Sequence, residues 1–495
     1  MISLITLSKK IKPKYLFSKM VLSVFFIAMG CTVFAQQNVQ IDFGKVVKKN
    51  VRKGAASANV CWLTDSDKKR PNDKQSFANA IKELGCGSLR FPYGHLADNY
   101  LWHTPPYDDT KNGLRPKVAS KEEQPYNWKE LVNDDGTFKS AMDFDEYMGL
   151  CQKLDIKPLV VVNVFSQKYK DGPTADELIT AATEWVKYAK RKNYKVAYWQ
   201  IGNEVDHHRK LLSQDAYVDF YQKITTAMKA ADPSIKVGPG ILEKSEYFDA
   251  IVSKYPNLID FTSAHQYAWQ FIKSCSNYEK WKANTEDYIP VVKEMQDAVS
   301  RSKKPDMDIV ITETGLSPIG KGMGDINNTY KALWYFNMLM NELTMPNVAY
   351  SYFWGTHSPW TGLKDNDAHD VEVLLRVDDN SRKPIGEVVK LVNENLFGNM
   401  VKTTTNANFV RSYASINDKK NNCKVFLLNK SNEPQKLILN FNQLPKNIKS
   451  LKAKEFKGDS PESIIINTKD LKAISISGNS TEITLSPLSV TILQN

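Results

Sequence analysis

Eight short apolar segments, each followed by a helical pattern, constrain the fold of this chain more than any other feature. "PLVVVNVF" and "MDIVITETG" are nearly continuous β-branched runs, typical of strands that are covered on both faces. Strands that alternate with helices in this way predict a (β/α)8 TIM barrel of the α/β class. The strands are expected at Ala56–Thr64, Gly87–Gly94, Lys157–Phe165, Tyr194–Glu204, Ile235–Leu242, Ile259–Ala268, Met307–Gly315 and Val348–Thr356.

The pattern changes after residue 396. Runs such as "CKVFLLNK" and "QKLILNFN" are short, lack a helical period and are separated by turn residues. They predict a C-terminal antiparallel β-sandwich domain over residues 397–495. Val39–Phe43 alternates between apolar and polar residues, so residues 36–55 are expected to carry an N-terminal strand that joins the sandwich. The barrel is then expected at residues 56–396.

Residues 1–35 are interpreted as a secretory signal peptide. Five lysines precede an apolar stretch of 15 residues, Val21–Ala35, which is too short to span a membrane comfortably. An A-x-A-like cleavage site precedes Gln36, so a secreted or periplasmic protein is expected. Lipidation of Cys31 is the alternative. No other long apolar run is present, so no membrane span is expected.

The charge and the cysteine content of the chain indicate neither a nucleic-acid-binding protein nor a metalloprotein. The leader lysines reduce the formal net charge from +11 to about +6 for the mature chain, and no arginine-rich stretch indicates binding to nucleic acid. Cys61, Cys86 and Cys151 lie in or beside apolar segments and belong to an odd set of five, which indicates buried free thiols. No Cys or His spacing is typical of a metal site, so neither a metal nor a cofactor is expected, and nothing indicates an oligomeric state.

Polar residues follow most of the expected strands, at the end of the barrel where active sites lie. Strand four ends on Asn203-Glu204 and strand seven on Glu313. Retaining glycoside hydrolysis needs such a pair of carboxyl groups, a nucleophile and a proton donor, about 5–5.5 Å apart. Other strand ends and nearby loops supply candidate substrate-binding residues. These are Arg90, Tyr93, Trp102, Asn163, Asn203, His265, Tyr267, Trp354 and Trp360.

Each candidate also has a simpler explanation. A single glutamate at a strand end is more often solvated or in a salt bridge, and aromatic residues in long loops can serve only to hold the loop. His207 and His208 beside Asp206 indicate a loop more than a metal site. Two glutamates on strands that face each other are more specific. Arg90 and Tyr267 would keep a carboxylate charged, and Asn203 could bind the hydroxyl next to the reacting carbon.

"WQIGNE" and "ITETG" resemble the acid/base and nucleophile segments of clan A retaining glycoside hydrolases. "SLRFPYGHLADNYLWH", "SAHQY" and the terminal "LSPLSVTIL" are similar to family 51 α-L-arabinofuranosidases, and families 39 and 79 share the barrel-plus-sandwich organisation. The resemblance implies a carbohydrate substrate, with Glu204 as acid/base and Glu313 as nucleophile. Family 51 usually has Gly, Cys and Trp where this chain has Tyr93, His95 and Thr314.

Other functions stay open at this point. Within the clan, the chain could be a β-glycosidase or an endo-glycanase of the xylosidase, glucuronidase or algal-glycan type. A catalytically inactive glycan-binding barrel would keep the aromatic residues but would not need both glutamates. A phosphate-using barrel enzyme would need a glycine-rich phosphate loop after strands seven and eight and often a lysine at a strand end, and neither is evident.

Overall fold

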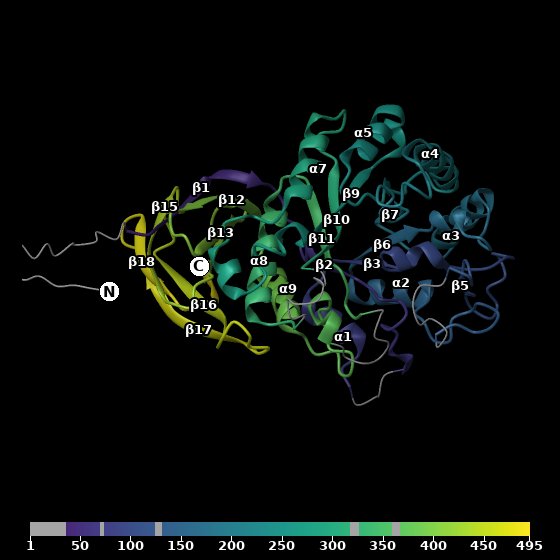
Figure 1. Ribbon diagram of the computed structural model, residues 1–495. Coiled ribbons are helices and arrows are strands. Elements are labelled where there is room, and N and C mark those ends of the chain that lie inside the picture. Colours follow the sequence, from purple (N-terminus) through teal and green to yellow (C-terminus); the bar gives the residue numbers. More distant parts are fainter. Residues whose placement is uncertain (1–35, 70–73, 124–130, 317–325, 359–366) are drawn as a thin grey trace, which may run out of the picture. The chain divides into compact units, whose positions relative to one another are not determined.

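The structure is a computed structural model that describes residues 36–69, 74–123, 131–316, 326–358 and 367–495 (Figure 1). Residues 37–495 form one compact unit, and the description below concerns that unit. The expected signal peptide, including Cys31, and Trp360 lie outside the described residues. Within the described ranges, no helix is long and apolar enough to cross a membrane.

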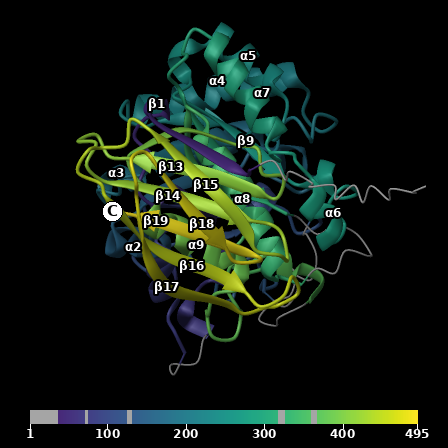
Figure 2. The same cartoon turned by 90° about the vertical axis from the view of Figure 1, so that its left-hand side faces the viewer.

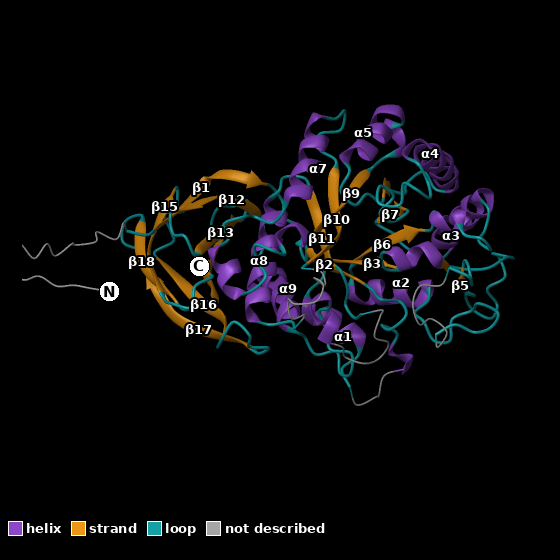
Figure 3. Cartoon of the chain, viewed as in Figure 1, coloured by secondary structure: helices purple, strands orange, loops and turns teal. Residues whose placement is uncertain are grey.

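The expected TIM barrel is confirmed. Its strands are hydrogen-bonded in the order β8-β7-β6-β3-β2-β11-β10-β9, all parallel, and helices surround them (Figure 3). The backbone N–H of Asp260 donates to the carbonyl oxygen of Val237 (2.8 Å), which links the two ends of this order and closes the barrel. The strands are β2 (Ala56–Asn59), β3 (Ser88–Phe91), β6 (Lys157–Val162), β7 (Tyr198–Ile201), β8 (Val237–Pro239), β9 (Phe261–Tyr267), β10 (Asp308–Gly315) and β11 (Val348–Phe353).

Amphipathic helices cover the outside of the barrel. The capping box at Thr174 and Glu177 starts α3: the Thr174 side chain accepts from the Glu177 N–H, and the Glu177 carboxylate accepts from the Thr174 N–H. A short hairpin of β4 (Tyr100–Leu101) and β5 (Lys117–Val118) follows β3. The helices are α1 (Phe77–Leu84), α2 (Phe144–Leu154), α3 (Ala175–Arg191), α4 (Gln214–Ala231), α5 (Ser245–Lys254), α6 (Tyr278–Ala283), α7 (Pro290–Arg301), α8 (Thr329–Thr344) and α9 (Pro384–Asn395).

The C-terminal β-sandwich is also confirmed, as a nine-stranded sheet in the order β17-β16-β19-β14-β13-β12-β1-β15-β18 (Figure 2). Strands from both halves of this sheet contribute to a single apolar core. The "SIIIN" segment differs from the expectation, because Ile464 and Ile465 are exposed and the strand begins only at Ile466. The strands are β1 (Asn38–Lys48), β12 (Asn399–Thr405), β13 (Val410–Ile416), β14 (Cys423–Asn429), β15 (Gln435–Asn442), β16 (Ser450–Gly458), β17 (Ile466–Ser475), β18 (Ser480–Leu485) and β19 (Ser489–Gln494).

Strand β1 lies within this sheet although it precedes the barrel in sequence. Ile41 stands opposite Thr403 of the antiparallel neighbour β12 and opposite Phe441 of the parallel neighbour β15. Val39, Ile41 and Phe43 are buried in the sandwich core. The alternation of apolar and polar residues therefore places one face of β1 in the core, as a period of two requires.

The cysteines in the described part of the chain are buried thiols. Cys61, Cys86, Cys151, Cys275 and Cys423 are all buried, and each of the five is free. This confirms the expectation for Cys61, Cys86 and Cys151. Burial raises the pKa of the Cys86 thiol to about 12, so this group stays protonated and unreactive at neutral pH.

Candidate active site

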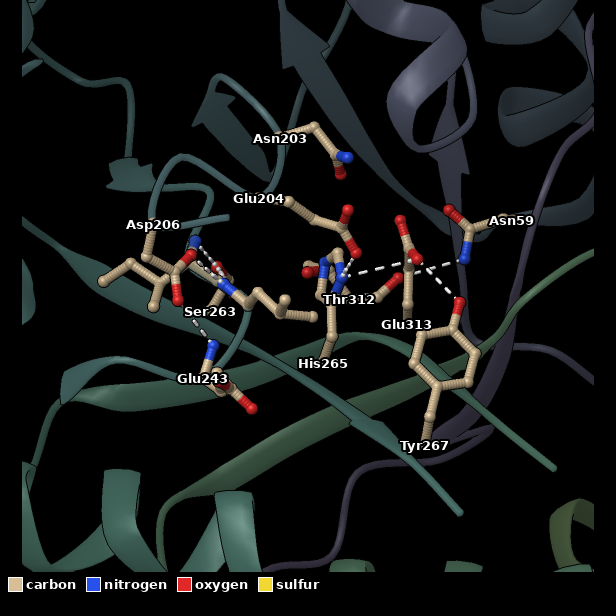
Figure 4. Close-up of polar contacts among 12 residues, drawn as sticks. Asn59, Asn203, Glu204, Asp206, Glu243, Ser263, His265, Tyr267, Thr312 and Glu313 are labelled. Atoms are coloured by element: carbon tan, nitrogen blue, oxygen red, sulfur yellow. Dashed lines mark hydrogen bonds and ion pairs between the residues drawn. The ribbon is translucent and has the colours of Figure 1, made fainter. Parts of the chain in front are cut away.

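Two glutamates meet at the carboxyl ends of the barrel strands (Figure 4). Glu204 follows β7, and Glu313 lies near the end of β10. One carboxyl oxygen of Glu204, one of Glu313 and a ring nitrogen of His265 all lie within 4.8 Å of one another. Retaining glycosidases place their two carboxyl groups about 5–5.5 Å apart, whereas inverting enzymes need about 6.5–9.5 Å to admit a water molecule. The spacing of this pair is that of a retaining enzyme.

Glu313 is held by two strong partners. Arg90 Nη1 donates to Oε1 at 2.9 Å, and the Tyr267 hydroxyl donates to Oε2 at 2.7 Å. Burial raises the pKa of Glu313, while neighbouring His265, the charge of Arg90 and the hydrogen bond from Tyr267 oppose that rise. Neutral Glu313 would leave the fully buried Arg90 guanidinium without its counter-ion, which is strongly unfavourable. The ion pair therefore favours an ionised Glu313.

Arg90 connects four barrel strands behind the two carboxyl groups. Besides Glu313, its guanidinium donates to Asn59 Oδ1 (2.7 Å), Gln200 Oε1 (3.0 Å) and Asn203 Oδ1 (2.6 Å). These acceptors come from β2, β7 and the segment after β7. The planar guanidinium presents its donors in a fixed fork, so it sets the positions of all four partners.

Glu204 has a different environment. Its side chain is 17% exposed, and one carboxyl oxygen lies 3.0 Å from Nδ1 of His265. Burial raises the pKa of Glu204 to about 7. Its backbone has a φ of 48°, in the left-handed region that is unfavourable for residues other than glycine. Such strain persists where the surroundings fix a functional side chain.

His265 stands between the two glutamates. Its Nδ1 lies 3.0 Å from Glu204 Oε1 and 3.3 Å from Glu313 Oε2. Burial lowers the pKa of His265 to about 4, so the ring is neutral at neutral pH and Nδ1–H can donate to an ionised carboxylate. Several buried polar atoms near these carboxyl groups have no hydrogen-bond partner within the described chain. They include His265 Nε2, Asn203 Nδ2 and the Tyr93 hydroxyl.

Glu204, His265 and Glu313 also have the residue types of metal ligands. However, Glu313 already accepts from Arg90 and Tyr267, and the buried guanidinium charge would repel a cation at this position. A carboxyl group with a pKa near 7 beside an ion-paired carboxylate is instead the arrangement of an acid and a nucleophile. The three residues therefore fit acid–base and nucleophilic chemistry better than they fit a metal site.

Aromatic side chains form one wall of the site. Trp354 stacks on His95 (ring centroids 5.8 Å apart) and contacts Tyr93 (4.6 Å). Gly94 between them approaches Glu313 so closely that a Cβ atom there would lie 2.2 Å from Oε1. Only glycine fits this position without displacing the carboxylate.

Two predicted substrate-binding side chains are held by contacts within the protein. Trp102 is buried against α3, where its indole N–H donates to the carbonyl of Ala181 and its ring stacks on Trp185. Asn163 uses its side-chain oxygen to accept from the N–H and hydroxyl of Ser166. Both side chains therefore stabilise the surrounding loops, because their polar groups are already paired within the protein. The prediction for Trp360 falls outside the described residues.

Other residues at the site did not stand out in the sequence. Asn59 is the last residue of β2 and Gln200 lies within β7, and both accept from Arg90. A polar residue in a fully buried strand is the signal that could have identified them. Trp269 is 44% exposed and stacks on Tyr267 at 4.7 Å. An exposed aromatic ring beside a sugar site is a candidate stacking surface.

The comparisons with known proteins agree with this geometry. Residues 80–286 match the family model described as "Alpha-L-arabinofuranosidase 1 domain". An intracellular exo-alpha-L-arabinofuranosidase from Bacteroides ovatus is 24% identical over 50% of this chain and 50% of its own length. An intracellular exo-alpha-(1->5)-L-arabinofuranosidase from Acetivibrio thermocellus is 22% identical over 47% of this chain and 46% of its own. The chain thus spans about half the length of the curated relatives that it matches.

Solved structures share the whole fold. An alpha-L-arabinofuranosidase from Thermotoga maritima superposes with a TM-score of 0.69 at 15% identity, over 93% of this chain and 99% of that one. A family 44 xyloglucanase from Paenibacillus polymyxa gives 0.62 at 14% identity, over 92% and 99%. Together with the family model, these similarities confirm the resemblance to clan A enzymes of the family 51 type.

Proposed function

We propose that this protein is a retaining glycoside hydrolase that releases α-L-arabinofuranosyl units from an oligosaccharide or polysaccharide. The observation that carries the proposal is the pair Glu204 and Glu313. Their carboxyl oxygens lie within 4.8 Å, one carboxylate is ion-paired with buried Arg90, and the pKa of the other is raised to about 7. The family model and the named relatives support the choice of arabinofuranose.

In the first step, the Glu313 carboxylate attacks the anomeric carbon of the bound sugar from the face opposite the leaving group. Protonated Glu204 gives its proton to the glycosidic oxygen, and the bond between this oxygen and the anomeric carbon breaks. The products are a glycosyl ester on Glu313, a released alcohol and an ionised Glu204. The raised pKa of Glu204 supports this role, because a useful proportion of the group is protonated at neutral pH.

In the second step, ionised Glu204 takes a proton from water while the water oxygen attacks the anomeric carbon. The ester bond breaks, Glu313 becomes a carboxylate again and Glu204 is protonated for the next cycle. Two inversions at one carbon retain its configuration. Arg90 and Tyr267 support Glu313 as the leaving group, since they bind it in its ionised form.

The unpartnered polar atoms support a ligand rich in hydroxyl groups. Asn203 Nδ2 can donate to a sugar oxygen, and His265 Nε2 can accept from a sugar hydroxyl when Nδ1 carries the ring proton. Buried polar groups are normally hydrogen-bonded, so a cluster of exceptions beside two carboxyl groups indicates partners that arrive with the substrate. Trp354 offers an apolar surface to the sugar ring.

We also propose export of the protein, with cleavage after Ala35. The basic and apolar leader supports this route. Edman sequencing of the protein from the extracellular or periplasmic fraction should begin at Gln36. A mature N-terminus at a lipid-modified Cys31 would establish the lipoprotein alternative, and an intact Met1 in the cytoplasmic fraction would contradict export.

A panel of 4-nitrophenyl glycosides tests the proposed activity. The α-L-arabinofuranoside should be hydrolysed, and NMR should show the α-configured sugar as the first product. If the enzyme prefers the β-D-xyloside, the β-D-glucuronide or polymeric xyloglucan, its substrate contains another sugar and the proposal of arabinofuranose is wrong. If the folded protein binds glycans but hydrolyses none of these substrates, it is a glycan-binding barrel and not an enzyme.

A further inference from the structure

We propose that Asp98 is a third carboxyl group of the active site, which exchanges a hydrogen bond with a hydroxyl group of the reacting sugar. The inference rests on the proposed glycosidase function and names one further group that binds the substrate. Nothing in the sequence pattern singles this residue out, because it lies in a loop segment between two assigned candidates, Tyr93 and Trp102.

The position of Asp98 in the chain places it at the site. It belongs to the 3-10 helix η2 (His95–Asn99), which follows the end of β3. Gly94, directly before this helix, packs against Glu313, and the ring of His95 stacks on Trp354. The turn that carries Asp98 is therefore a wall of the site.

The carboxyl group of Asp98 is buried but not used by the fold. The residue is only 4% exposed, and its Oδ1 atom has no hydrogen-bond partner among the described residues. Its neighbour Asn99 has the structural task in this loop, because the Asn99 side chain accepts from the Ser120 N–H (2.7 Å) and donates to the Ser120 carbonyl (3.0 Å). A buried polar group without a partner is rare in a folded protein and calls for an explanation.

The electrostatic surroundings indicate which ligand would fit. Burial raises the pKa of Asp98 well above its usual range, the charges of Glu204 and Glu313 raise it further, and Arg90 opposes them. This shift favours the neutral form of Asp98, in which the carboxyl group can both donate and accept a hydrogen bond. A sugar hydroxyl also donates and accepts, so it matches this group better than a cation does.

A functional role predicts an unusual combination of effects. A buried carboxyl group without a partner destabilises the free protein, because its lost hydration is not replaced. Asp98→Leu, which keeps a similar shape, should therefore raise Tm while it lowers activity. Such a trade-off is typical of residues that are kept for function. A residue that only supports the loop would show the opposite effect on Tm.

The decisive experiment compares deoxy substrates in the wild-type protein and in Asp98→Leu. The 4-nitrophenyl α-L-arabinofuranoside and its 2-, 3- and 5-deoxy analogues are the probes. Asp98→Leu should lower kcat/KM for the parent glycoside about 10–100-fold, the usual effect of losing one buried hydrogen bond. For one of the three deoxy analogues the two proteins should react at nearly equal rates, because the partner hydroxyl is already missing.

Asp145→Asn is a matched control. Asp145 lies on α2 and accepts hydrogen bonds from the hydroxyls of Tyr188 and Tyr194, away from the two catalytic carboxyl groups. This variant should lower Tm and leave kcat/KM unchanged for every glycoside. Asp98→Asn, which keeps a donor and an acceptor, should recover part of the activity that Asp98→Leu loses.

The outcomes separate this inference from the proposed function. If the wild-type protein hydrolyses another sugar, the deoxy series of that sugar replaces the arabinofuranosides and the comparison stays the same. Equal loss on the parent and on all deoxy analogues, together with a lower Tm for Asp98→Leu, would overturn the role of Asp98 while the glycosidase function stands. Unchanged kcat/KM in Asp98→Leu would overturn it as well.

Discussion

Glu204 and Glu313 carry the same side chain, and their neighbours give them different environments. Glu313 is fully enclosed by Arg90 and Tyr267, both of which bind the ionised form. Glu204 is slightly exposed, and its pKa is raised to about 7 by burial without an ion pair to an arginine. When the surroundings of two neighbouring carboxyl groups push their pKa values apart, one group can act as an acid and the other as a nucleophile.

The pH dependence of kcat/KM tests this difference at the residue scale. Glu204 must be protonated to act as the acid, so kcat/KM for a substrate with a poor leaving group should fall about tenfold per pH unit above about pH 7. Glu204→Gln should react slowly with this substrate, and its rate should lack the alkaline decline. If the decline persists unchanged in Glu204→Gln, another group titrates there and the assignment of the acid is wrong.

At the scale of elements, the sequence predicts the strands better than the loops. All eight barrel strands lie inside their predicted segments because β-branched runs that are buried on both faces have few other solutions. Glu204 and Glu313 could be located because strand ends define the mouth of the barrel. Trp102 could not be placed, because the direction of a side chain in a long loop depends on tertiary packing, here against Trp185. Asn59 and Gln200, which accept from Arg90, were missed for a different reason: both lie in strands, and no strand pattern shows which side chains meet inside the barrel.

Strand β1 provides a test at this scale. Ile41 is 1% exposed in the sandwich core, whereas its neighbour Gln40 is exposed. Ile41→Ala should lower the free energy of unfolding by about 2–5 kcal/mol, because it removes buried apolar atoms and leaves a cavity. Gln40→Ala should change it by less than about 0.5 kcal/mol. Urea unfolding of both variants measures the difference. Equal effects would show that β1 does not stabilise the sandwich.

In the whole molecule, the proposed active site belongs to the barrel. The polar contacts found for Glu204 and Glu313 among the described residues all come from barrel residues. The sandwich instead contacts the outer helices. For example, the Tyr413 hydroxyl of β13 donates a hydrogen bond to the side-chain oxygen of Asn337 on α8 (2.6 Å). Destabilising the sandwich should therefore reduce the amount of folded enzyme without changing the pH dependence of its catalysis.

Chemical rescue by azide tests the central claim most directly. Glu204→Ala should lose about 10²–10⁴-fold in rate on substrates with poor leaving groups, and much less in the first step with an activated aryl glycoside. Azide should then restore turnover and give a glycosyl azide of retained configuration, because it attacks the ester on Glu313. Glu313→Ala should hydrolyse no glycoside, and any azide product that it forms should have inverted configuration. A retained azide product from Glu313→Ala would reverse the two roles, and unchanged rates in both variants would contradict the assignment of these two glutamates altogether.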